Sequence, residues 1–254
     1  MLNPQTGMVP AVRTLVVLPT YDEAANIAEV LGQVRAAAPE ADILVVDDNS
    51  PDGTADLARA AAEELGQIDV EVRAQKDGLG NAYRHGFRIG IERGYDVLMQ
   101  MDADLSHDPT AVPTLLRAID DGADAVIGSR YVPGGSIPHW PWYRRAMSKY
   151  GNSYACAVLG MSVRDATSGY RAYRVGVLRE IDVDSTRAKG YGFQIETAYR
   201  VQRAGQKLGE VPITFTDRVR GYSKMSLTVA AEELLLVTWW GLRDRVLRRN
   251  RPAR

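Results

Sequence analysis

Short apolar runs alternate with amphipathic stretches over the first half of the chain. The apolar runs are rich in β-branched residues and end at proline, aspartate or serine, which is typical of buried strands that stop at a turn. The amphipathic stretches have helical spacing, as in Ile27, Val30, Leu31 and Val34, which fall on one stripe. The pattern predicts strands at residues 13–19, 43–48, 70–74, 95–101 and 124–129, separated by helices at residues 23–38, 54–65, 80–93 and 109–121.

Strands that alternate with helices at these lengths favour an α/β fold with a mostly parallel central sheet, right-handed crossovers and flanking helices. The near-continuous apolar character of the strands also favours this fold, because helices bury both faces of such a sheet. Ligands of these sheets bind beyond the carboxyl ends of the strands. Polar clusters follow four of the predicted strands, at residues 19–23, 47–48, 102–104 and 129–130. We therefore expect these four clusters to form one ligand crevice.

The cluster at residues 102–104 is the most informative. Asp102 and Asp104 follow an apolar strand at a spacing of two residues, so both carboxylates leave the strand on the same side. Two like charges held this close repel unless a cation lies between them, and hard oxygen ligands suit Mg²⁺ or Mn²⁺ with positions open for substrate phosphates. A solvated acidic loop is the alternative for the pair alone, and the convergence of four clusters favours a metal–diphosphate site.

A second acidic pair, Asp47 and Asp48, ends the second predicted strand. Either carboxylate is suited to accept hydrogen bonds from ribose hydroxyls or a base. The alternative is that the pair structures the turn at residues 49–53, where we expect Asp52 to supply the N-cap of the next helix.

Length and composition set the limits of this interpretation. The 254 residues are 45% hydrophobic and 25% charged, enough for one large globular core. A net charge of −1 argues against a nucleic-acid-binding protein, although residues 243–254 hold six arginines and one aspartate. The single cysteine, Cys156, excludes an internal disulfide and is expected in the core. Residues 1–10 lack the basic and apolar regions of a secretion signal.

Eight motifs, in order along the chain, resemble those of family 2 glycosyltransferases, and within that family those of dolichyl- or polyprenyl-phosphate mannose synthases. They are residues 19–23, 45–54, 78–80 with Ala82, 102–106, 129–131, 168–171, 190–194 and 218–224. The resemblance covers about residues 13–226. It implies a GT-A fold, GDP-mannose as the donor, a polyprenyl phosphate as the acceptor, Mg²⁺ or Mn²⁺ on the diphosphate, and inversion at the sugar.

The resemblance also implies roles for individual residues on the donor side. The guanosine end would be held by Pro19, Tyr21, Glu23, Val46 and Asp48. Asp102, Ala103 and Asp104 would face the ribose, the diphosphate and the metal.

Ser106 stands where relatives often carry glutamine as a third metal contact. Its hydroxyl is shorter and neutral, so direct ligation and a bridging water both stay open.

Four basic residues match positions that contact phosphates in the family. Arg130, Arg218 and Lys224 would contact the donor and take part in catalysis with Asp102 and Asp104. The acceptor phosphate would meet Arg130, Arg144 and Lys224. For any one of them, a solvated basic surface is the alternative.

The polyprenyl phosphate needs no dedicated general base. The second pKa of a phosphate is about 6, so the attacking oxygen is largely deprotonated at neutral pH. The three histidines, His85, His107 and His139, lack metal-ligand spacing, and we expect them to be packing or surface residues. The sequence leaves two other functions open. One is a polyprenyl-phosphate glucosyltransferase that uses UDP-glucose; the more distant one is a phospho-receiver signalling domain, suggested by residues 45–48.

We expect three segments, namely an N-terminal tail at residues 1–12, the catalytic domain at 13–226, and an amphipathic helix with a basic tail at 227–254. All four tryptophans fall in an aromatic and basic loop at 136–145 or in the helix at 227–247. The longest uncharged part of that helix is nine residues, far below the roughly 20 needed to span a bilayer.

These segments predict a peripheral protein on the cytoplasmic face of a membrane. A helix that closes the core with an ordinary basic tail, and docking on a membrane-protein partner, are the alternatives.

Overall fold

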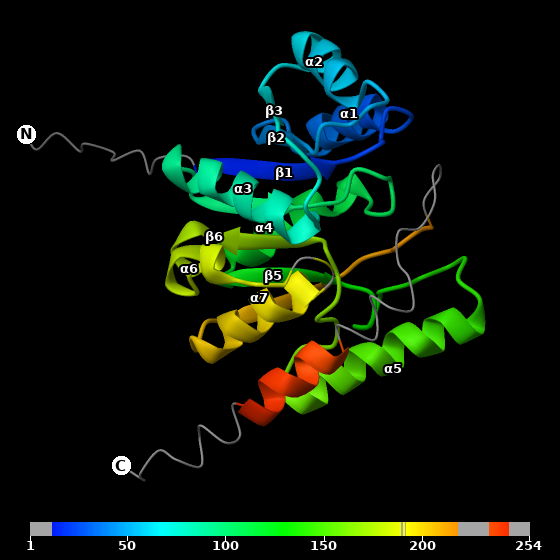
Figure 1. The fold of residues 1–254 in the computed structure, drawn as a ribbon, viewed down its shortest axis with the longest axis vertical. Helices are drawn as coiled ribbons and strands as arrows, with labels where there is room; N and C mark the ends of the chain where they lie inside the picture. Colours follow the sequence, from blue (N-terminus) through cyan, green and yellow to red (C-terminus); the bar gives the residue numbers. More distant parts are fainter. Residues whose placement is uncertain (1–11, 189, 191, 218–233, 244–254) are drawn as a thin grey trace, which may run out of the picture.

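The computed structural model describes residues 12–188, 190, 192–217 and 234–243. Within them, one seven-stranded sheet has the order β3-β2-β1-β4-β6-β5-β7 (Figure 1). Strand β6 is antiparallel to both of its neighbours, and every other pairing is parallel, so the predicted mostly parallel sheet is confirmed. The strands are β1 (Thr14–Thr20), β2 (Asp42–Asp47), β3 (Ile68–Val72), β4 (Val97–Gln100), β5 (Ala125–Ser129), β6 (Arg171–Arg174) and β7 (Leu208–Pro212).

Helices cover both faces of the sheet. They are α1 (Ile27–Ala37), α2 (Thr54–Leu65), α3 (Leu79–Glu92), α4 (Val112–Asp120), α5 (Trp142–Leu159), α6 (Val175–Glu180) and α7 (Gly192–Arg203), with short 3₁₀ turns at Pro109–Ala111 and Val183–Ser185. Helices α3, α5, α6 and α7 pack on one face together with residues 234–243, which are also helical. Helices α1 and α4 pack on the other face, and α2 lies against α1.

A hydrophobic core lies on each face of the sheet, because successive side chains along a strand point to opposite faces. In β2, Leu44 and Val46 face the α3 side, whereas Ile43 and Val45 face the α1 side, and all four are buried. Each such burial contributes about 1.5–3 kcal/mol of hydrophobic free energy. Helix α3 lies close to the sheet at Gly86, where an added Cβ would overlap the Val17 side chain.

The first half of the chain follows the sequence prediction, with element boundaries that differ by a few residues. The predicted N-cap is wrong. Gly53, in the left-handed region with φ of 85°, precedes α2, while Asp52 accepts hydrogen bonds from the backbone N–H groups of Thr54 and Ala24. Asp52 therefore joins the turn after β2 to the loop after β1.

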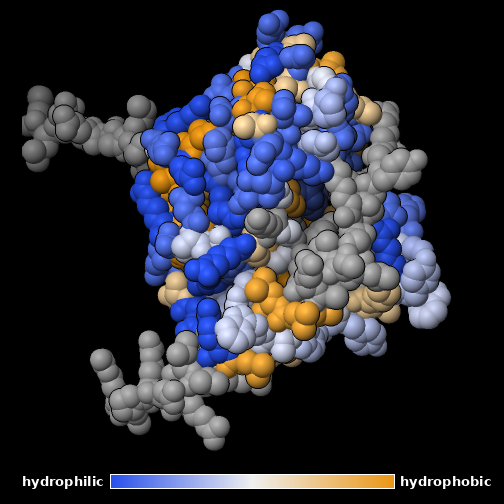
Figure 2. Space-filling model, viewed as in Figure 1, coloured by the Kyte–Doolittle hydropathy of each residue, from blue (hydrophilic) through white to orange (hydrophobic). Residues whose placement is uncertain are grey.

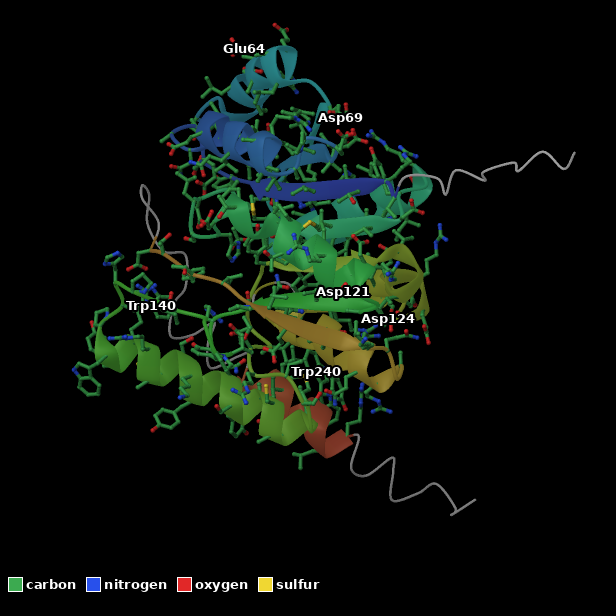
Figure 3. All side chains as sticks on the ribbon, turned by 180° about the vertical axis from the view of Figure 1, so that it is seen from behind. Glu64, Asp69, Asp121, Asp124, Trp140 and Trp240 are labelled. Atoms are coloured by element: carbon green, nitrogen blue, oxygen red, sulfur yellow. The ribbon has the colours of Figure 1, made fainter. Side chains whose placement is uncertain are left out.

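The aromatic segment differs from the predicted loop. Helix α5 begins at Trp142, so residues 142–145 form its first turn. Trp140 is buried, and its Nε1 donates a hydrogen bond to Asp217 at 2.7 Å. Trp240 is also buried, whereas Trp142 and Trp239 are exposed. Figure 3 places Trp140 near the start of α5 and Trp240 within the molecule beside that helix. Of the four tryptophans in the two segments predicted to lie at a membrane, Trp142 and Trp239 are therefore available at the surface and Trp140 and Trp240 are not.

Only part of the predicted C-terminal helix is described. Residues 234–243 lie beside α5 (Figure 1), and the hydroxyls of Tyr154 and Thr238 are hydrogen-bonded at 2.8 Å. The rest of residues 227–254 and the tail at residues 1–11 lie outside the described residues. Among the helices that are described, none combines the length and the apolar character needed to cross a membrane.

Cys156 lies in the core, as expected, and burial raises the pKa of its thiol to about 11.

Candidate active site

Three of the four predicted polar clusters meet at one edge of the sheet. Strand β1 pairs with β2 on one side and with β4 on the other, all parallel, so their carboxyl ends share an edge. This brings the segments after Thr20, Asp47 and Gln100 together. The fourth cluster, at Arg130, follows β5, which is separated from β4 by β6. Because β4 and β5 are both antiparallel to β6, the carboxyl end of β5 lies at the same edge as the other three, one strand farther along the sheet.

Asp47 and Asp48 have different roles in the structure. The Asp47 carboxylate accepts hydrogen bonds from the hydroxyls of Thr20 at 2.7 Å and Ser50 at 2.6 Å and from the Ser50 N–H, so it fixes the turn. Asp48 instead accepts a hydrogen bond from Arg73 at 2.7 Å. Burial raises the pKa of Asp48 above its ordinary value, although Arg73 opposes the shift. Asp48 is thus the member of the pair that suits a ligand contact.

The other predicted nucleoside contacts differ in their burial and in their partners. Glu23 is buried and accepts a hydrogen bond from the Asn26 side chain at 2.8 Å, and Pro19 is partly buried at the end of β1. The Tyr21 ring lies 3.7 Å from the Lys76 ammonium, a cation–π contact. Val46 differs, because its side chain is fully buried in the core on the α3 side.

Sequence reasoning missed Arg73 and Lys76, which follow β3 at the same edge. Their position at the end of the predicted strand at residues 70–74 was the available signal.

The Asp102–Asp104 segment is held by local hydrogen bonds. An oxygen of Asp102 accepts from the Tyr83 hydroxyl at 3.0 Å, and an oxygen of Asp104 accepts from the Ser106 N–H at 3.0 Å. The Asp102 side chain is 28% exposed, while Asp104, Ala103 and Ser106 are buried. Burial, followed by the nearby Asp102, raises the pKa of Tyr83 well above its ordinary value, so Tyr83 stays a hydrogen-bond donor. Tyr83 was not predicted from the sequence.

His107 belongs to this site, although the sequence suggested only a packing or surface role. Its Nδ1 accepts a hydrogen bond from the Asp102 N–H at 3.1 Å, which assigns the proton to Nε2. Its ring packs against Tyr170 and Phe215, with centroid distances of 5.0 and 5.5 Å. Burial lowers the pKa of His107, so the ring is neutral and orients the Asp102 backbone. Its proximity to Asp104 in sequence was the signal for this role.

The acidic pair fits a hard divalent cation. Among the described residues, no group of three or more histidine, cysteine, aspartate or glutamate side chains could enclose a metal. The predicted pair would supply two carboxylates, and Mg²⁺ is commonly bound by one or two carboxylates with substrate phosphates and water completing its shell. This donor set fits a metal that binds together with a diphosphate.

Arg130 is held rigidly by one buried carboxylate. Its Nε and Nη2 donate to the two oxygens of Asp165 at 2.7 and 2.8 Å, and its backbone N–H donates to the same group at 3.0 Å. Thr167 accepts a further bond from Nη2 at 2.6 Å. Burial raises the pKa of Asp165, but the charge and hydrogen bonds of Arg130 outweigh it, so the pKa is lowered overall. The bidentate pair fixes the plane of the guanidinium.

Arg144, in the first turn of α5, contacts Trp140 in the preceding loop and Asp217. Its guanidinium pairs with Asp217 at 2.9 Å and stacks on Trp140 with a distance of 3.9 Å to the ring centroid. Arg218 and Lys224, the two other predicted phosphate contacts, lie outside the described residues.

Two motifs of unassigned role lie beside Asp102. Gln100 donates hydrogen bonds to the Gly169 carbonyl at 2.9 Å and to the Gln194 side chain at 2.5 Å. A Cβ added to Gly169 would lie 3.6 Å from both the Asp102 carboxylate and the Gln194 amide. The segments around Gly169 and Gln194 therefore line the wall behind the acidic pair.

The mixed, mostly parallel seven-stranded sheet with helices on both faces is a GT-A-like fold, as the resemblance implied. The sequence profile described as "Glycosyl transferase family 2" matches residues 15–182, and the chain belongs to this family. This membership overturns the alternative of a phospho-receiver domain.

Two curated relatives match nearly their whole length. An undecaprenyl-phosphate mannosyltransferase of Micrococcus luteus is 51% identical over 233 residues, which cover 92% of this chain and 96% of the relative. A polyprenol monophosphomannose synthase of Mycolicibacterium smegmatis is 49% identical over 238 residues, which cover 93% and 90%.

Solved structures show the same fold at low identity. Glucosyl-3-phosphoglycerate synthase of Mycobacterium tuberculosis, crystallised with Mn²⁺, UDP-glucose and phosphoglyceric acid, has a TM-score of 0.66 at 20% identity, covering 92% of this chain and 80% of that one. A mannosyltransferase of Pyrobaculum calidifontis, in complex with GDP-mannose and Mn²⁺, has a TM-score of 0.61 at 15% identity, covering 95% and 66%.

Replacing Asp165 by asparagine should cost about 3 kcal/mol of unfolding free energy at neutral pH, because Arg130 stays buried without its charged partner. The pKa of Asp165 is lower in the folded protein than its ordinary value of 3.8. The carboxylate therefore adds stability above about pH 4, and this contribution is lost as the pH falls through the folded-state value. Denaturant titrations should show the difference between wild type and Asp165→Asn shrinking below about pH 4. A difference that stays constant in acid would contradict this assignment.

Proposed function

We propose that this protein transfers mannose from GDP-mannose to a polyprenyl phosphate, with inversion, and so makes a lipid-linked mannose donor. The observation that carries the proposal is the near full-length identity of 51% and 49% to two enzymes named for mannose transfer to polyprenyl carriers. The site is compatible with this reaction, because it offers an acidic pair and a rigid arginine at one crevice.

The donor side is proposed at the edge formed by β1, β2 and β4. We place the guanosine end near Pro19, Tyr21, Glu23, Val46 and Asp48. Arg73 and Lys76 supply positive charge beside Asp48 and Tyr21. Such cations suit a ligand that carries a diphosphate.

Asp102 and Asp104 would hold Mg²⁺ or Mn²⁺, with Ala103 between them and Ser106 contributing directly or through water. When bound, the cation neutralises the negative charge that develops on the leaving diphosphate. Tyr83 and His107 keep Asp102 in place through its carboxylate and its backbone N–H. Arg218 and Lys224 stay predicted contacts of the donor phosphates.

The acceptor attacks with a phosphate oxygen that is already deprotonated near neutral pH. Asp165 fixes the Arg130 guanidinium. Arg130, Arg144 and Lys224 stay predicted contacts of the acceptor phosphate.

The lipid substrate favours a protein that works at a membrane surface without spanning it. Trp142 and Tyr150 on α5 are 77% and 75% exposed, and Leu235 and Trp239 are exposed on the neighbouring helix. On the face in Figure 2, hydrophilic side chains cover the part around α1 to α3, and hydrophobic ones gather near α7 and residues 234–243. Exposed tryptophan and tyrosine suit the headgroup level of a bilayer. We propose that this surface contacts the cytoplasmic leaflet of the membrane. The alternative is that it binds a membrane-protein partner.

The defining test offers the purified protein a polyprenyl phosphate with GDP-mannose or, separately, with UDP-glucose. Mass spectrometry of the lipid extract should show a mannosyl phosphate with GDP-mannose and only traces of a glucosyl phosphate with UDP-glucose. Product from UDP-glucose alone would replace the proposal with the glucosyltransferase alternative.

Asp104→Asn should keep the fold and lower turnover by about 100-fold or more, because several kcal/mol of charge stabilisation depend on the metal. Circular dichroism checks the fold and initial rates check turnover over a titration of Mg²⁺ and Mn²⁺. Excess metal should restore little activity, and a rate near wild type would reject Asp104 as a ligand.

Truncation after Arg243 should weaken sedimentation with anionic vesicles at least about tenfold, since each arginine near such a surface contributes about 1 kcal/mol. It should leave sedimentation with neutral vesicles and activity on detergent-dispersed acceptor nearly unchanged. Equal sedimentation of both proteins with anionic vesicles would show that the basic tail has no role there.

A further inference from the structure

Gln194 carries a buried hydrogen-bond donor that has no partner among the described residues. The residue lies in the first turn of α7 and is 1% exposed, yet its Nε2 meets no acceptor in that part of the chain. Buried polar groups in folded proteins are nearly always hydrogen-bonded, because an unpaired one retains the full cost of its removal from water. An unpaired donor beside the acidic pair therefore indicates a group whose partner is a ligand.

The orientation of this amide follows from its neighbours. The Gly169 carbonyl can only accept, so the Gln100 atom that lies 2.9 Å from it must be Nε2. The same Nε2 donates to Gln194 at 2.5 Å, so the Gln194 atom that faces it must be Oε1. Rotating either amide by half a turn would set two acceptors or two donors against each other. The remaining Gln194 atom is thus assigned as an N–H donor.

The backbone of Gln194 is fixed as well as its side chain. Arg171, which is fully buried in β6, donates from Nη1 to the Gln194 carbonyl at 2.7 Å. The same guanidinium donates to the carbonyls of Ala166 and Ser168 at 2.7 and 2.8 Å, so it joins α7 to the segment that precedes β6. The donor is therefore held in place before a ligand binds, which lowers the cost of ordering on binding.

The space beside Gly169 joins this donor to the acidic pair. A Cβ added to Gly169 would lie 3.6 Å from both Gln194 Nε2 and Asp102 Oδ2, which is an ordinary contact distance. His107 Cε1 would lie 3.5 Å from the same point. One non-hydrogen atom therefore fits there without overlap. Gly169 and the Asp102 side chain are partly exposed, so a ligand in the crevice can reach this point.

The combination of a donor and an acceptor around one point favours a hydroxyl group. A hydroxyl accepts one hydrogen bond and donates another, so it satisfies the Gln194 amide and the Asp102 carboxylate together. An ionised phosphate oxygen only accepts, and the negative charge of Asp102 would repel it. The space beside Gly169 thus suits a neutral, hydroxylated part of a substrate.

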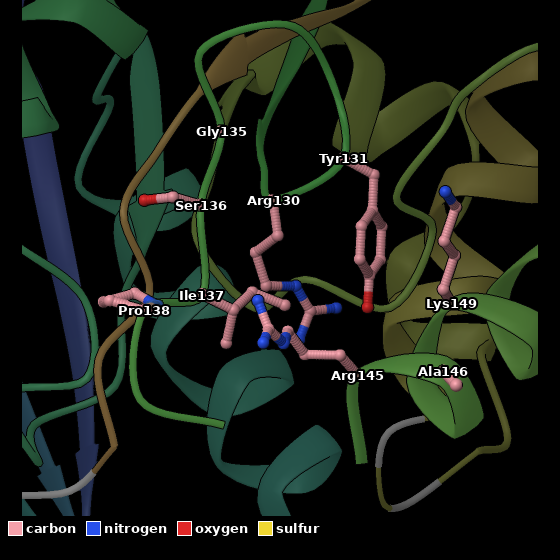
Figure 4. A pocket seen from close by; sticks show the side chains of 9 residues that line it. All are labelled: Arg130, Tyr131, Gly135, Ser136, Ile137, Pro138, Arg145, Ala146 and Lys149. Atoms are coloured by element: carbon pink, nitrogen blue, oxygen red, sulfur yellow. The ribbon is translucent and has the colours of Figure 1, made fainter. Parts of the chain in front are cut away.

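The order of the sheet places this hydroxyl on the sugar rather than on the ribose. Gly169 lies just before β6, which pairs with β4 on the side opposite β1 and β2. The proposed guanosine end lies at β1 and β2, so Gly169 is on the far side of Asp102 from it. Beyond β6, Arg130 follows β5 and lines a pocket with Ile137 and Arg145 (Figure 4). The group between the nucleotide and Arg130 is the sugar that is transferred.

We propose that Gln194 recognises the transferred sugar, because its Nε2 donates a hydrogen bond to one hydroxyl of the mannose while Asp102 Oδ2 accepts from that hydroxyl. The inference rests on the proposed function and extends it to the motif around Gln194, which had no assigned role. Gln100 is then a positioning residue for the amide. Gly169 leaves the hydroxyl its place.

The test measures kcat/KM for GDP-mannose and for four analogues that each lack one hydroxyl of the mannose, with a detergent-dispersed polyprenyl phosphate. Wild type should lose about three- to tenfold with at least one analogue, the scale of one neutral hydrogen bond. Gln194→Met keeps a similar volume without the donor. It should lose the same factor with GDP-mannose and nothing further with that analogue. Because GDP lacks the sugar, its inhibition constant should stay at the wild-type value.

Two further measurements show whether the effect is local. The thermal midpoint of Gln194→Met should stay near that of wild type, because the lost bond from Gln100 is offset by the removal of an unpaired buried donor. Gln202→Met is the matched control on the same helix. The Gln202 side chain accepts from the Ser162 N–H and donates to the Gly160 carbonyl. This control should keep the wild-type kcat/KM for every donor.

The outcomes distinguish the possible failures. A wild type that makes no lipid-linked mannose overturns the proposed function itself. An active wild type for which Gln194→Met loses the same factor with GDP-mannose and with all four analogues overturns the sugar contact, since additive losses mean that Gln194 and the hydroxyls act independently. Unchanged kinetics in Gln194→Met also overturn it. Weaker inhibition by GDP, or a higher KM for the acceptor, would assign the amide to the nucleotide or to the acceptor phosphate and overturn it as well.

Discussion

The parallel pairing of β1 with both β2 and β4 is the constraint on which the donor side depends. Parallel strands in register end together, so one edge of the sheet collects the segments after Thr20, Asp47 and Gln100. Helix α3 must lie close to these strands for Tyr83 to reach Asp102, and Gly86 leaves room for that approach. Packing on the α3 face is therefore linked to the position of a metal-ligand candidate.

The proposed acceptor side depends on a different interaction, the buried pair of Arg130 and Asp165. Removing charges from water is costly, and the cost is offset here by bidentate geometry and by the additional bonds to the Arg130 backbone and to Thr167. The result is a guanidinium whose plane is fixed before any ligand arrives. Preorganised charge of this kind stabilises a reacting phosphate without further rearrangement.

The sequence allowed the first five strands and the acidic pair to be predicted, because apolar periodicity and short motifs depend on local residues. Strand β6 was missed because it begins with Arg171, a fully buried arginine whose charge hides the strand pattern. Its guanidinium is satisfied by the carbonyls of Ala166, Ser168 and Gln194, partners that only the fold brings together. Likewise, the burial of Trp140 depends on Asp217, which lies 77 residues away. The different surroundings of Arg144 and Arg145 follow from helix phase, which a loop assignment could not give.

The antiparallel strand β6 divides the sheet into two parallel groups, β3-β2-β1-β4 and β5-β7. Most of the predicted nucleotide contacts follow strands of the first group, whereas Arg130 follows β5 in the second. The segment between β5 and β6, which includes α5, contributes no strand to the pairing of β1 with β2 and β4. The sheet order therefore lets this segment vary in sequence and length while the pairing that gathers the predicted nucleotide contacts is kept.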